Sequence, residues 1–141
     1  MPNIYLYSMQ TNEVQEQAGL NWCFSHGNVS NQDAYIALTH SFFRENPSFF
    51  PEHGSVINVA WDDGTEMRLL LEGTQSINGE TKPKQISTVG DKSILGRYLR
   101  GRLNIDSTHR IVREDLQNYG REEILVTFDE ENQRYLFDFS V

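Results

Sequence analysis

The residues whose spacing comes nearest to a catalytic motif are Glu80 and Lys82, a Glu-x-Lys pair of the kind found in many metal-dependent nucleases. Asp62 and Asp63 lie upstream and are possible metal ligands. Those nucleases place the pair on a strand, whereas here it follows the turn residues Asn78-Gly79 and precedes a proline. We therefore keep a metal-dependent nuclease that uses Glu80 and Lys82 as the less favoured alternative.

Other catalytic and metal-binding patterns give no support for an enzyme. Cys23 and His26 have zinc-like spacing, but the sequence has no second pair of ligands to complete a site. No Gly-rich phosphate loop follows a predicted strand, and the four histidines are scattered along the chain. We expect no catalytic site, no metal site and no cofactor.

Positive charge is concentrated in one stretch of an acidic chain. The 141 residues carry 12 Lys+Arg against 20 Asp+Glu, a net charge of −8. Nine of the cations lie between Lys82 and Arg121, and none precedes Arg44. This stretch has four carboxylates, so its local charge is +5 (nine positive minus four negative). A basic face can bind a polyanion that the whole protein would otherwise repel.

Polar residues near these cations have the chemistry of nucleic-acid recognition. Lysines hold phosphates, and Gln and Asn pair with base edges. Lys82, Lys84 and Lys92 lie among Gln, Ser and Thr, while Trp22 and Phe24 flank a loop rich in Asn, Gln, Ser and His. The aromatic rings either pack in the core or stack on a base. Composition alone favours nucleic-acid binding over a merely solvated basic loop.

The elements that must position these residues are mostly strands. Strands are expected at 4–7 and 20–24, and residues 34–38 are either a strand or the start of a helix that reaches Phe43. Residues 56–61 and 67–71 form a hairpin around Asp62-Asp63-Gly64, and residues 72–89 read as a polar segment with a turn at Asn78-Gly79. Residues 124–128 and 135–139 form a second hairpin, with Tyr135, Phe137 and Phe139 on one face.

Two helices complete the expected fold. The first covers Lys92–Leu103, with Asp91 as its N-cap and Asn104 as its stop. Its core-facing residues are expected to be Ile94, Leu95, Tyr98 and Leu99, opposite Ser93, Arg97 and Arg100. A second helix covers Arg113–Tyr119 and ends at a left-handed Gly120. About seven short strands with two helices predict a single domain, 1–141, that is a small barrel or strongly curved sheet.

The compartment is indicated by what the sequence lacks. A single cysteine, Cys23, excludes an intrachain disulfide. The N-terminal residues do not form a signal peptide, and no apolar run approaches the roughly 20 residues needed to cross a bilayer. We expect a soluble, cytoplasmic protein without a membrane partner.

The order of several short motifs resembles the C-terminal domain of the NgoFVII/BfiI-type restriction endonucleases. The resemblance covers nearly the whole chain, and its motifs are specific in their combined order and spacing rather than singly. The motifs are Gly19–Trp22, Asn31–Ile36, Phe49–Pro51, Asp62–Gly64, Asp91–Leu103, Glu114–Leu116, Tyr119–Arg121 and Tyr135–Val141.

This resemblance implies a B3-like open seven-stranded pseudobarrel that grips double-stranded DNA between two recognition arms. By position the first arm is Leu20–Asp33 and the second is Glu72–Lys92. The nuclease of that family is a separate domain that nothing in this chain matches, so the chain is expected to be a non-catalytic recognition module, with a nuclease domain or subunit as a possible partner. Family members tend to have arginines in the first arm, whereas residues 21–32 have none.

The predicted DNA contacts follow from these arms. Lysines would hold phosphates, polar side chains would read bases, and the loss of cations from the first arm makes a contact to a base methyl group more plausible. A protein-interaction barrel whose basic helix binds an acidic partner remains an alternative. The predicted contacts are Asn21, Trp22, Ser25, His26, Asn28, Asn31, Gln32, Gln75, Lys82, Lys84, Gln85, Ser87, Thr88 and Lys92.

Overall fold

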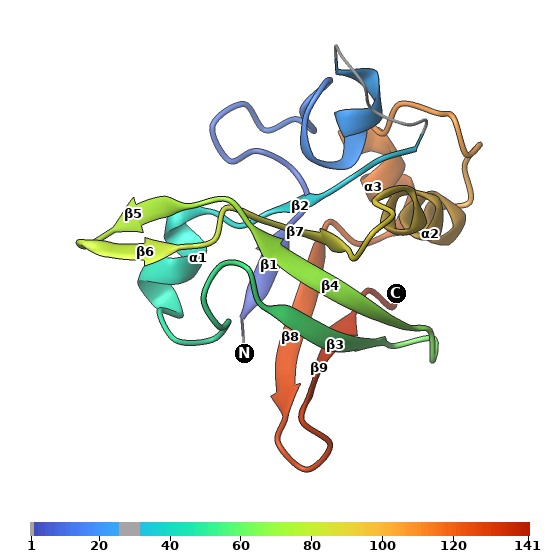
Figure 1. The fold of residues 1–141 in the computed structure, drawn as a ribbon. Coiled ribbons are helices and arrows are strands. Elements are labelled where there is room, and N and C mark those ends of the chain that lie inside the picture. The colour runs from blue at the N-terminus through green and yellow to red at the C-terminus, as the bar shows by residue number, and fades with distance from the viewer. Residues whose placement is uncertain (1, 26–31) are drawn as a thin grey trace.

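A strongly curved sheet of seven strands forms the body of the protein (Figure 1). The computed structural model describes residues 2–25 and 32–141. All neighbouring strands of this sheet are antiparallel except β3 and β9, which are parallel. The strands lie in the order β1 (Asn3–Tyr5), β8 (Glu123–Asp129), β9 (Arg134–Asp138), β3 (Val56–Trp61), β4 (Glu66–Glu72), β7 (Gln85–Thr88) and β2 (Ile36–Ala37).

The sheet is curled but not closed, because β1 and β2 are its two edges. This confirms the mainly β, open seven-stranded pseudobarrel expected from the resemblance. A separate two-stranded sheet, β5 (Gln75–Ile77) with β6 (Glu80–Lys82), follows β4 and precedes β7 in the chain, and it projects from the body of the protein. Asn78 and Gly79 form its turn with φ of 53° and 81°, the left-handed conformations that a two-residue hairpin loop requires. The turn was predicted; its flanking strands and β7 lie in what was read as a polar segment.

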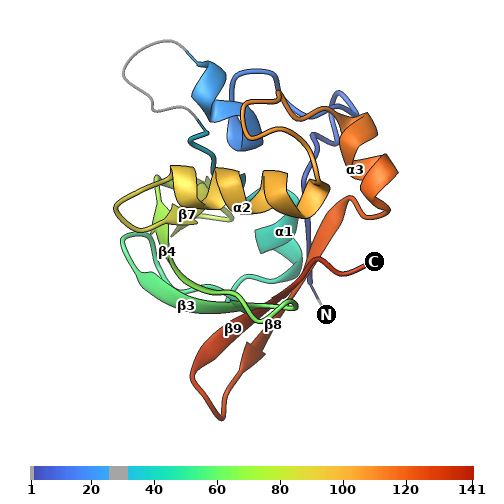
Figure 2. The same ribbon diagram turned by 90° about the vertical axis from the view of Figure 1, so that its right-hand side faces the viewer.

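Helices lie at both ends of the curled sheet (Figures 1 and 2). Helix α1 (His40–Glu45) and helix α2 (Ser93–Leu103) lie at opposite ends, and α3 (Arg113–Tyr119) lies beside α2. Each contributes fully or nearly fully buried side chains to one core, among them Phe43 of α1, Leu95 and Leu99 of α2, and Leu116 of α3. Complete burial of one such side chain is worth about 1.5–3 kcal/mol.

The hairpin and helix-end predictions are confirmed. Strands β3 and β4 pair around Asp62-Asp63-Gly64, and β8 pairs with β9. Tyr135, Phe137 and Phe139 are all buried. The left-handed residues Asn104 and Gly120 end α2 and α3 as expected.

Other local predictions are wrong. Residues 20–24 are not a strand but part of a 3-10 helix, η1 (Gly19–Phe24), whose Asn21 side chain donates to the backbone of Gln15 and of the distant Ile111. The sequence left undecided whether residues 34–38 are a strand or the start of a helix, and the structure has strand β2 followed by helix α1. Thr39 Oγ1 caps the first turn of α1 by accepting from Phe42 N at 3.2 Å. On α2, Ile94 is 41% exposed and Arg100 is 1% exposed, the reverse of their expected places.

Helix α2 begins at Ser93 rather than at Lys92, although Asp91 Oδ1 still accepts from Ser93 N at 3.0 Å. In the described part of the chain, no helix is both long enough and apolar enough to cross a membrane.

Candidate nucleic-acid interface

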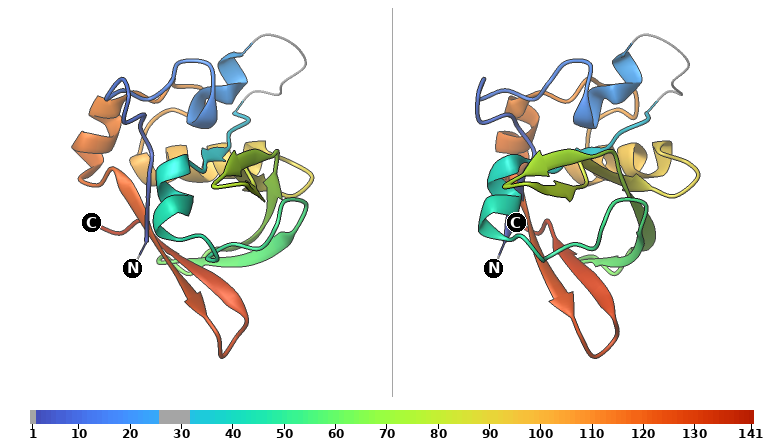
Figure 3. Two further views of the ribbon diagram at one scale, coloured as in Figure 1. Left: turned by 90° about the vertical axis from the view of Figure 1, so that its left-hand side faces the viewer. Right: turned by 60° about the vertical axis from the view of Figure 1, so that its left-hand side comes forward.

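A groove of about 900 Å³ opens beside the free edges of the sheet, and each predicted arm contributes one residue to its lining, Leu20 and Gln75. Its walls come from β1 and the residues that follow it, from the start of η1, from β2 and α1, and from Gln75 on β5. Figure 3 (left) views this side, with η1 above the β5–β6 hairpin. The open pseudobarrel therefore has a hollowed side to which both arms contribute.

The second arm is a hairpin fixed at its base by Gln75. The Nε2 atom of Gln75 donates to Leu38 O at 2.8 Å and to Pro83 O at 2.7 Å. Its Oε1 atom accepts no hydrogen bond from a described residue, so this oxygen is available to a ligand. Gln85, at the start of β7, is half-buried.

The three lysines of the second arm differ in how strongly the protein holds them. Lys82 Nζ donates to Pro47 O at 2.6 Å and pairs with Glu80 at 3.1 Å. Lys92 pairs with Glu72. Lys84 is exposed and has no ion-pair partner among the residues that the structure describes. Lys84 is thus the lysine most ready to bind a phosphate.

Two other predicted contacts in this arm are buried. Ser87 is 0% exposed and donates from Oγ to Ala34 O at 2.6 Å. Thr88 is 3% exposed, donates to Asp91 O and accepts from Leu95 N. Both hydroxyls hold β7 against its neighbours, so we remove these two residues from the proposed DNA contacts.

Asn21 of the first arm is also buried, at 0% exposed, and its side chain joins two distant backbone segments. Its Nδ2 donates to Gln15 O at 2.8 Å and to Ile111 O at 2.7 Å, and its Oδ1 accepts from Ile111 N at 2.8 Å. Because every polar atom of this amide is satisfied inside the protein, Asn21 too is removed from the proposed base contacts.

Arg100 strengthens the same junction. Its guanidinium donates to His109 O at 2.9 Å, to Leu20 O at 3.3 Å and to Asn21 Oδ1 at 3.4 Å. Burial lowers the pKa of Arg100, partly offset by the nearby Cys23, yet an arginine remains charged at neutral pH. This buried cation therefore joins α2, η1 and the loop that follows α2.

The first arm also receives a cation from that loop. The Cζ atom of Arg110 lies 4.7 Å from the ring centroid of Phe24, at the end of η1. Such a cation–π contact is worth about 0.5–1 kcal/mol at an exposed site. No pattern in the sequence predicts it, because the two residues are far apart in the chain and belong to different elements.

The end of the first arm packs directly on α2. A Cβ atom added to Gly96 would lie 1.7 Å from Gln32 O, so only a glycine permits this approach. Trp22 and Ser25 are half-buried, and the Trp22 ring meets Tyr35 edge-on at a centroid distance of 5.8 Å. Gln32 is half-buried with a φ of 76°. The predicted contacts His26, Asn28 and Asn31 lie outside the described residues.

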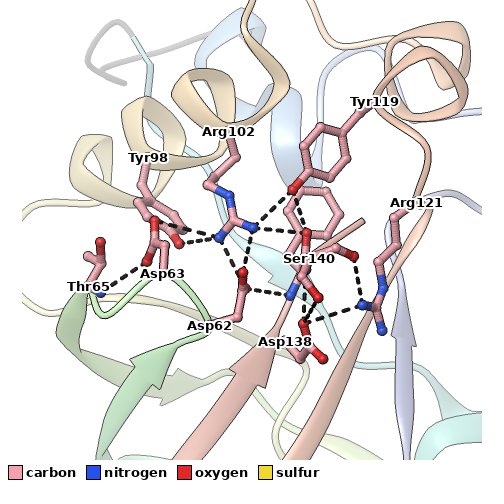
Figure 4. Close-up of polar contacts among 10 residues, drawn as sticks. Asp62, Asp63, Thr65, Tyr98, Arg102, Tyr119, Arg121, Asp138 and Ser140 are labelled. Atoms are coloured by element: carbon pink, nitrogen blue, oxygen red, sulfur yellow. Dashed lines mark hydrogen bonds and ion pairs between the residues drawn. The ribbon is translucent and has the colours of Figure 1, made fainter.

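Arg102 is the centre of a polar cluster at the other end of α2 (Figure 4). It donates to both carboxylate oxygens of Asp62, to Tyr98 Oη at 2.7 Å and to Tyr119 Oη at 2.9 Å. Burial alone would lower its pKa, but these hydrogen bonds raise it above the usual value. Burial raises the pKa of Tyr98. The cluster joins the β3–β4 turn to α2 and α3.

This cluster bears on the nuclease alternative. Glu80 and Lys82 do lie on a strand, β6, so that objection is removed. However, Asp62 and Asp63 are bound by Arg102, and the β3–β4 turn and the β5–β6 hairpin lie at opposite ends of the molecule (Figure 1). Among the described residues, no three His, Cys, Asp or Glu side chains are grouped as metal ligands. The structure does not bring the expected metal ligands to the Glu-x-Lys pair.

The protein-interaction alternative required a basic face on α2. That face is smaller than the sequence suggests, because Arg100 is buried and Arg102 is paired with Asp62. Arg97 remains exposed, and its Nη1 donates to Ser93 Oγ at 2.9 Å. A single exposed arginine on the helix does not favour an acidic protein partner.

Comparison with known families gives one match over most of the chain. The model of the NgoFVII C-terminal B3-like DNA-binding domain matches residues 2–130. None of the curated proteins compared with the chain matches it.

Proposed function

This chain belongs to the family of NgoFVII C-terminal B3-like DNA-binding domains, and we propose that it reads a specific sequence in double-stranded DNA as the recognition module of a restriction-modification-type system. The observation that supports this most is the groove of about 900 Å³ beside the open edges of the pseudobarrel, which is lined by Leu20 of the first arm and Gln75 of the second. A nuclease domain or subunit would supply cleavage, and this module would supply binding.

The two arms have different parts in this proposal. Lys84 binds a phosphate directly, while Lys82 and Lys92 exchange their carboxylate partners for phosphates as DNA approaches. Phosphate contacts fix the register of the protein on the duplex, and side chains at base edges give the sequence preference. Among the described residues, the candidates for base edges are Ser25, Gln32, Gln75 and Gln85, each half-buried. The proposal also keeps His26, Asn28 and Asn31.

A preference for base methylation is part of the proposal. The first arm has no cation in residues 21–32, but it carries the half-buried ring of Trp22. An apolar ring surface suits the methyl group that thymine or 5-methylcytosine places in the major groove. We expect methylation of a cytosine in the recognised site to change the affinity.

A selection from a random duplex pool, with and without cytosine methylation, tests the function. We expect a defined consensus sequence, and an observed association constant that falls steeply as salt increases. A pool with no enriched sequence and a flat dependence on salt would rule out DNA reading. Enrichment that ignores methylation would remove the methylation preference and leave sequence-specific binding intact.

A further inference from the structure

The first arm lacks basic residues of its own, but the fold places an arginine of the α2–α3 loop against it. Figure 2 shows the segment between α2 and α3 running beside η1 at the top of the molecule. Residues 21–32 contain no Lys or Arg, whereas this neighbouring segment contains Arg110. Arg110 therefore supplies a positive charge beside the first arm from a different part of the chain.

The residues on both sides of Arg110 are held by buried or partly buried hydrogen bonds. On one side, Arg100 Nε donates to His109 O at 2.9 Å. On the other, the amide of Asn21 forms two hydrogen bonds with the backbone of Ile111, at 2.7 and 2.8 Å. Because Arg100 and Asn21 are themselves buried and joined, the backbone at residue 110 has a fixed place beside η1.

The side chain of Arg110 is exposed, and like Lys84 and Arg97 it has no carboxylate partner among the described residues. Within the described ranges, no carboxylate oxygen lies within 4.0 Å of its guanidinium, whereas Arg102, Arg113 and Arg121 of the same basic stretch all pair with carboxylates. Its guanidinium lies over the ring of Phe24, with Cζ 4.7 Å from the ring centroid. An aromatic face orients a planar guanidinium while leaving its N–H donors free for a phosphate.

We propose that Arg110 binds a phosphate of the DNA backbone next to the first arm, as the cation that serves this arm from outside it. This inference rests on the DNA binding proposed above. Asn21 and Arg100 then have a definite purpose, since they hold the loop where Arg110 can act. Because a phosphate contact carries no sequence information, Arg110 contributes affinity and not base preference.

The test is the salt dependence of DNA binding by Arg110→Gln, measured by fluorescence anisotropy with the selected duplex and with a scrambled one. We expect the slope of log K against log salt to decrease in magnitude by about 1, with equal weakening on both duplexes. Arg110→Lys keeps the charge and should keep the wild-type slope.

Arg134→Gln is the matched control, because it removes the same charge at the β8–β9 turn, at the opposite end of the molecule from η1 (Figure 1). If DNA binding by the wild-type protein did not depend on salt, the proposed function itself would be overturned. A wild-type protein that binds DNA, with the same slope for Arg110→Gln as for Arg134→Gln, would overturn only the inference about Arg110. The inference about Arg110 would also be overturned if Arg110→Lys reduced the slope of log K against log salt as much as Arg110→Gln does.

Discussion

The guanidinium of Arg102 and the carboxylate of Asp62 form two parallel hydrogen bonds, from Nη1 to Oδ1 at 3.1 Å and from Nη2 to Oδ2 at 2.8 Å. The two side chains are 14% and 18% exposed, so the pair is largely withdrawn from water. Asp62 Oδ1 also accepts from Phe139 N at 2.7 Å. The pair thus fixes the β3–β4 turn, helix α2 and the end of β9 relative to one another.

Arg102→Gln should lower the free energy of unfolding by about 3 kcal/mol, because it leaves the largely buried carboxylate of Asp62 without its positively charged partner. Urea denaturation monitored by tryptophan fluorescence measures the change. Arg134→Gln is the control: its ion pairs with Glu66 and Asp129 are more exposed, and their loss should cost at most about 1 kcal/mol. Equal losses in the two variants would contradict the structural role of Arg102.

Asp138 should make the stability of the protein depend on acid. Hydrogen bonds from the side chain and the backbone of Ser140, with a smaller contribution from Arg121, hold the pKa of Asp138 below its usual value. The folded state therefore favours the carboxylate, which stabilises the protein above the unfolded-state pKa of about 3.9. This contribution disappears as the pH falls through the lower folded-state pKa.

Asp138→Asn should consequently lower the free energy of unfolding at pH 7 and have little effect once the pH is below the folded-state pKa of Asp138. Urea denaturation of both proteins at a series of pH values from 7 downward measures the difference. A difference that stays constant over the whole series would show that the charge of Asp138 is not what stabilises the β9 end.

Gly96→Ala should displace the first arm from α2, because its Cβ would lie 1.7 Å from Gln32 O. We expect a loss of DNA affinity together with a change in the fluorescence of Trp22. Gly101→Ala, on the same helix with open space around the new Cβ, should leave DNA binding unchanged and add about 0.5–1 kcal/mol of stability. Normal DNA affinity in Gly96→Ala would mean that the arm's contact with α2 is not needed for binding.

The lysines of the second arm should contribute unequally. Lys84→Gln should weaken DNA binding uniformly across sequences and reduce the salt slope by about 1, because no described carboxylate competes for this lysine. Glu72→Gln should have the opposite effect, since it releases Lys92 from its ion pair. Binding titrations at several salt concentrations measure both, and weaker binding by Glu72→Gln would contradict a role for Lys92 at phosphates.

The sequence predicts those parts of the fold that depend on local chemistry. Turns at Asn78-Gly79 and Asp62-Asp63-Gly64, and helix ends at Asn104 and Gly120, follow from backbone conformations that few residues adopt. They were predicted correctly because their causes lie within a few neighbouring positions.

Features that depend on distant partners were not predictable in this way. Arg100 reads as a solvent-facing helix residue, and its burial follows from carbonyl groups of His109 and Leu20 that only the tertiary fold brings close. Asn21 reads as a base-reading residue for the same reason, since its partner Ile111 comes much later in the chain. In the candidate interface, the polar character of the two arms was visible in sequence, but which side chains stay accessible was not.

The place of the β8–β9 hairpin has a consequence for how the protein folds. In the sheet this hairpin lies between β1 and β3, with Leu125 opposite Asn3 and Tyr135 opposite Val59. Strands β1 and β3 therefore have unpaired edges during synthesis until residues 123–138 have emerged. Long-range pairings of this kind slow folding, and exposed strand edges favour aggregation. The pseudobarrel should therefore be completed late, once the β8–β9 hairpin has inserted between β1 and β3.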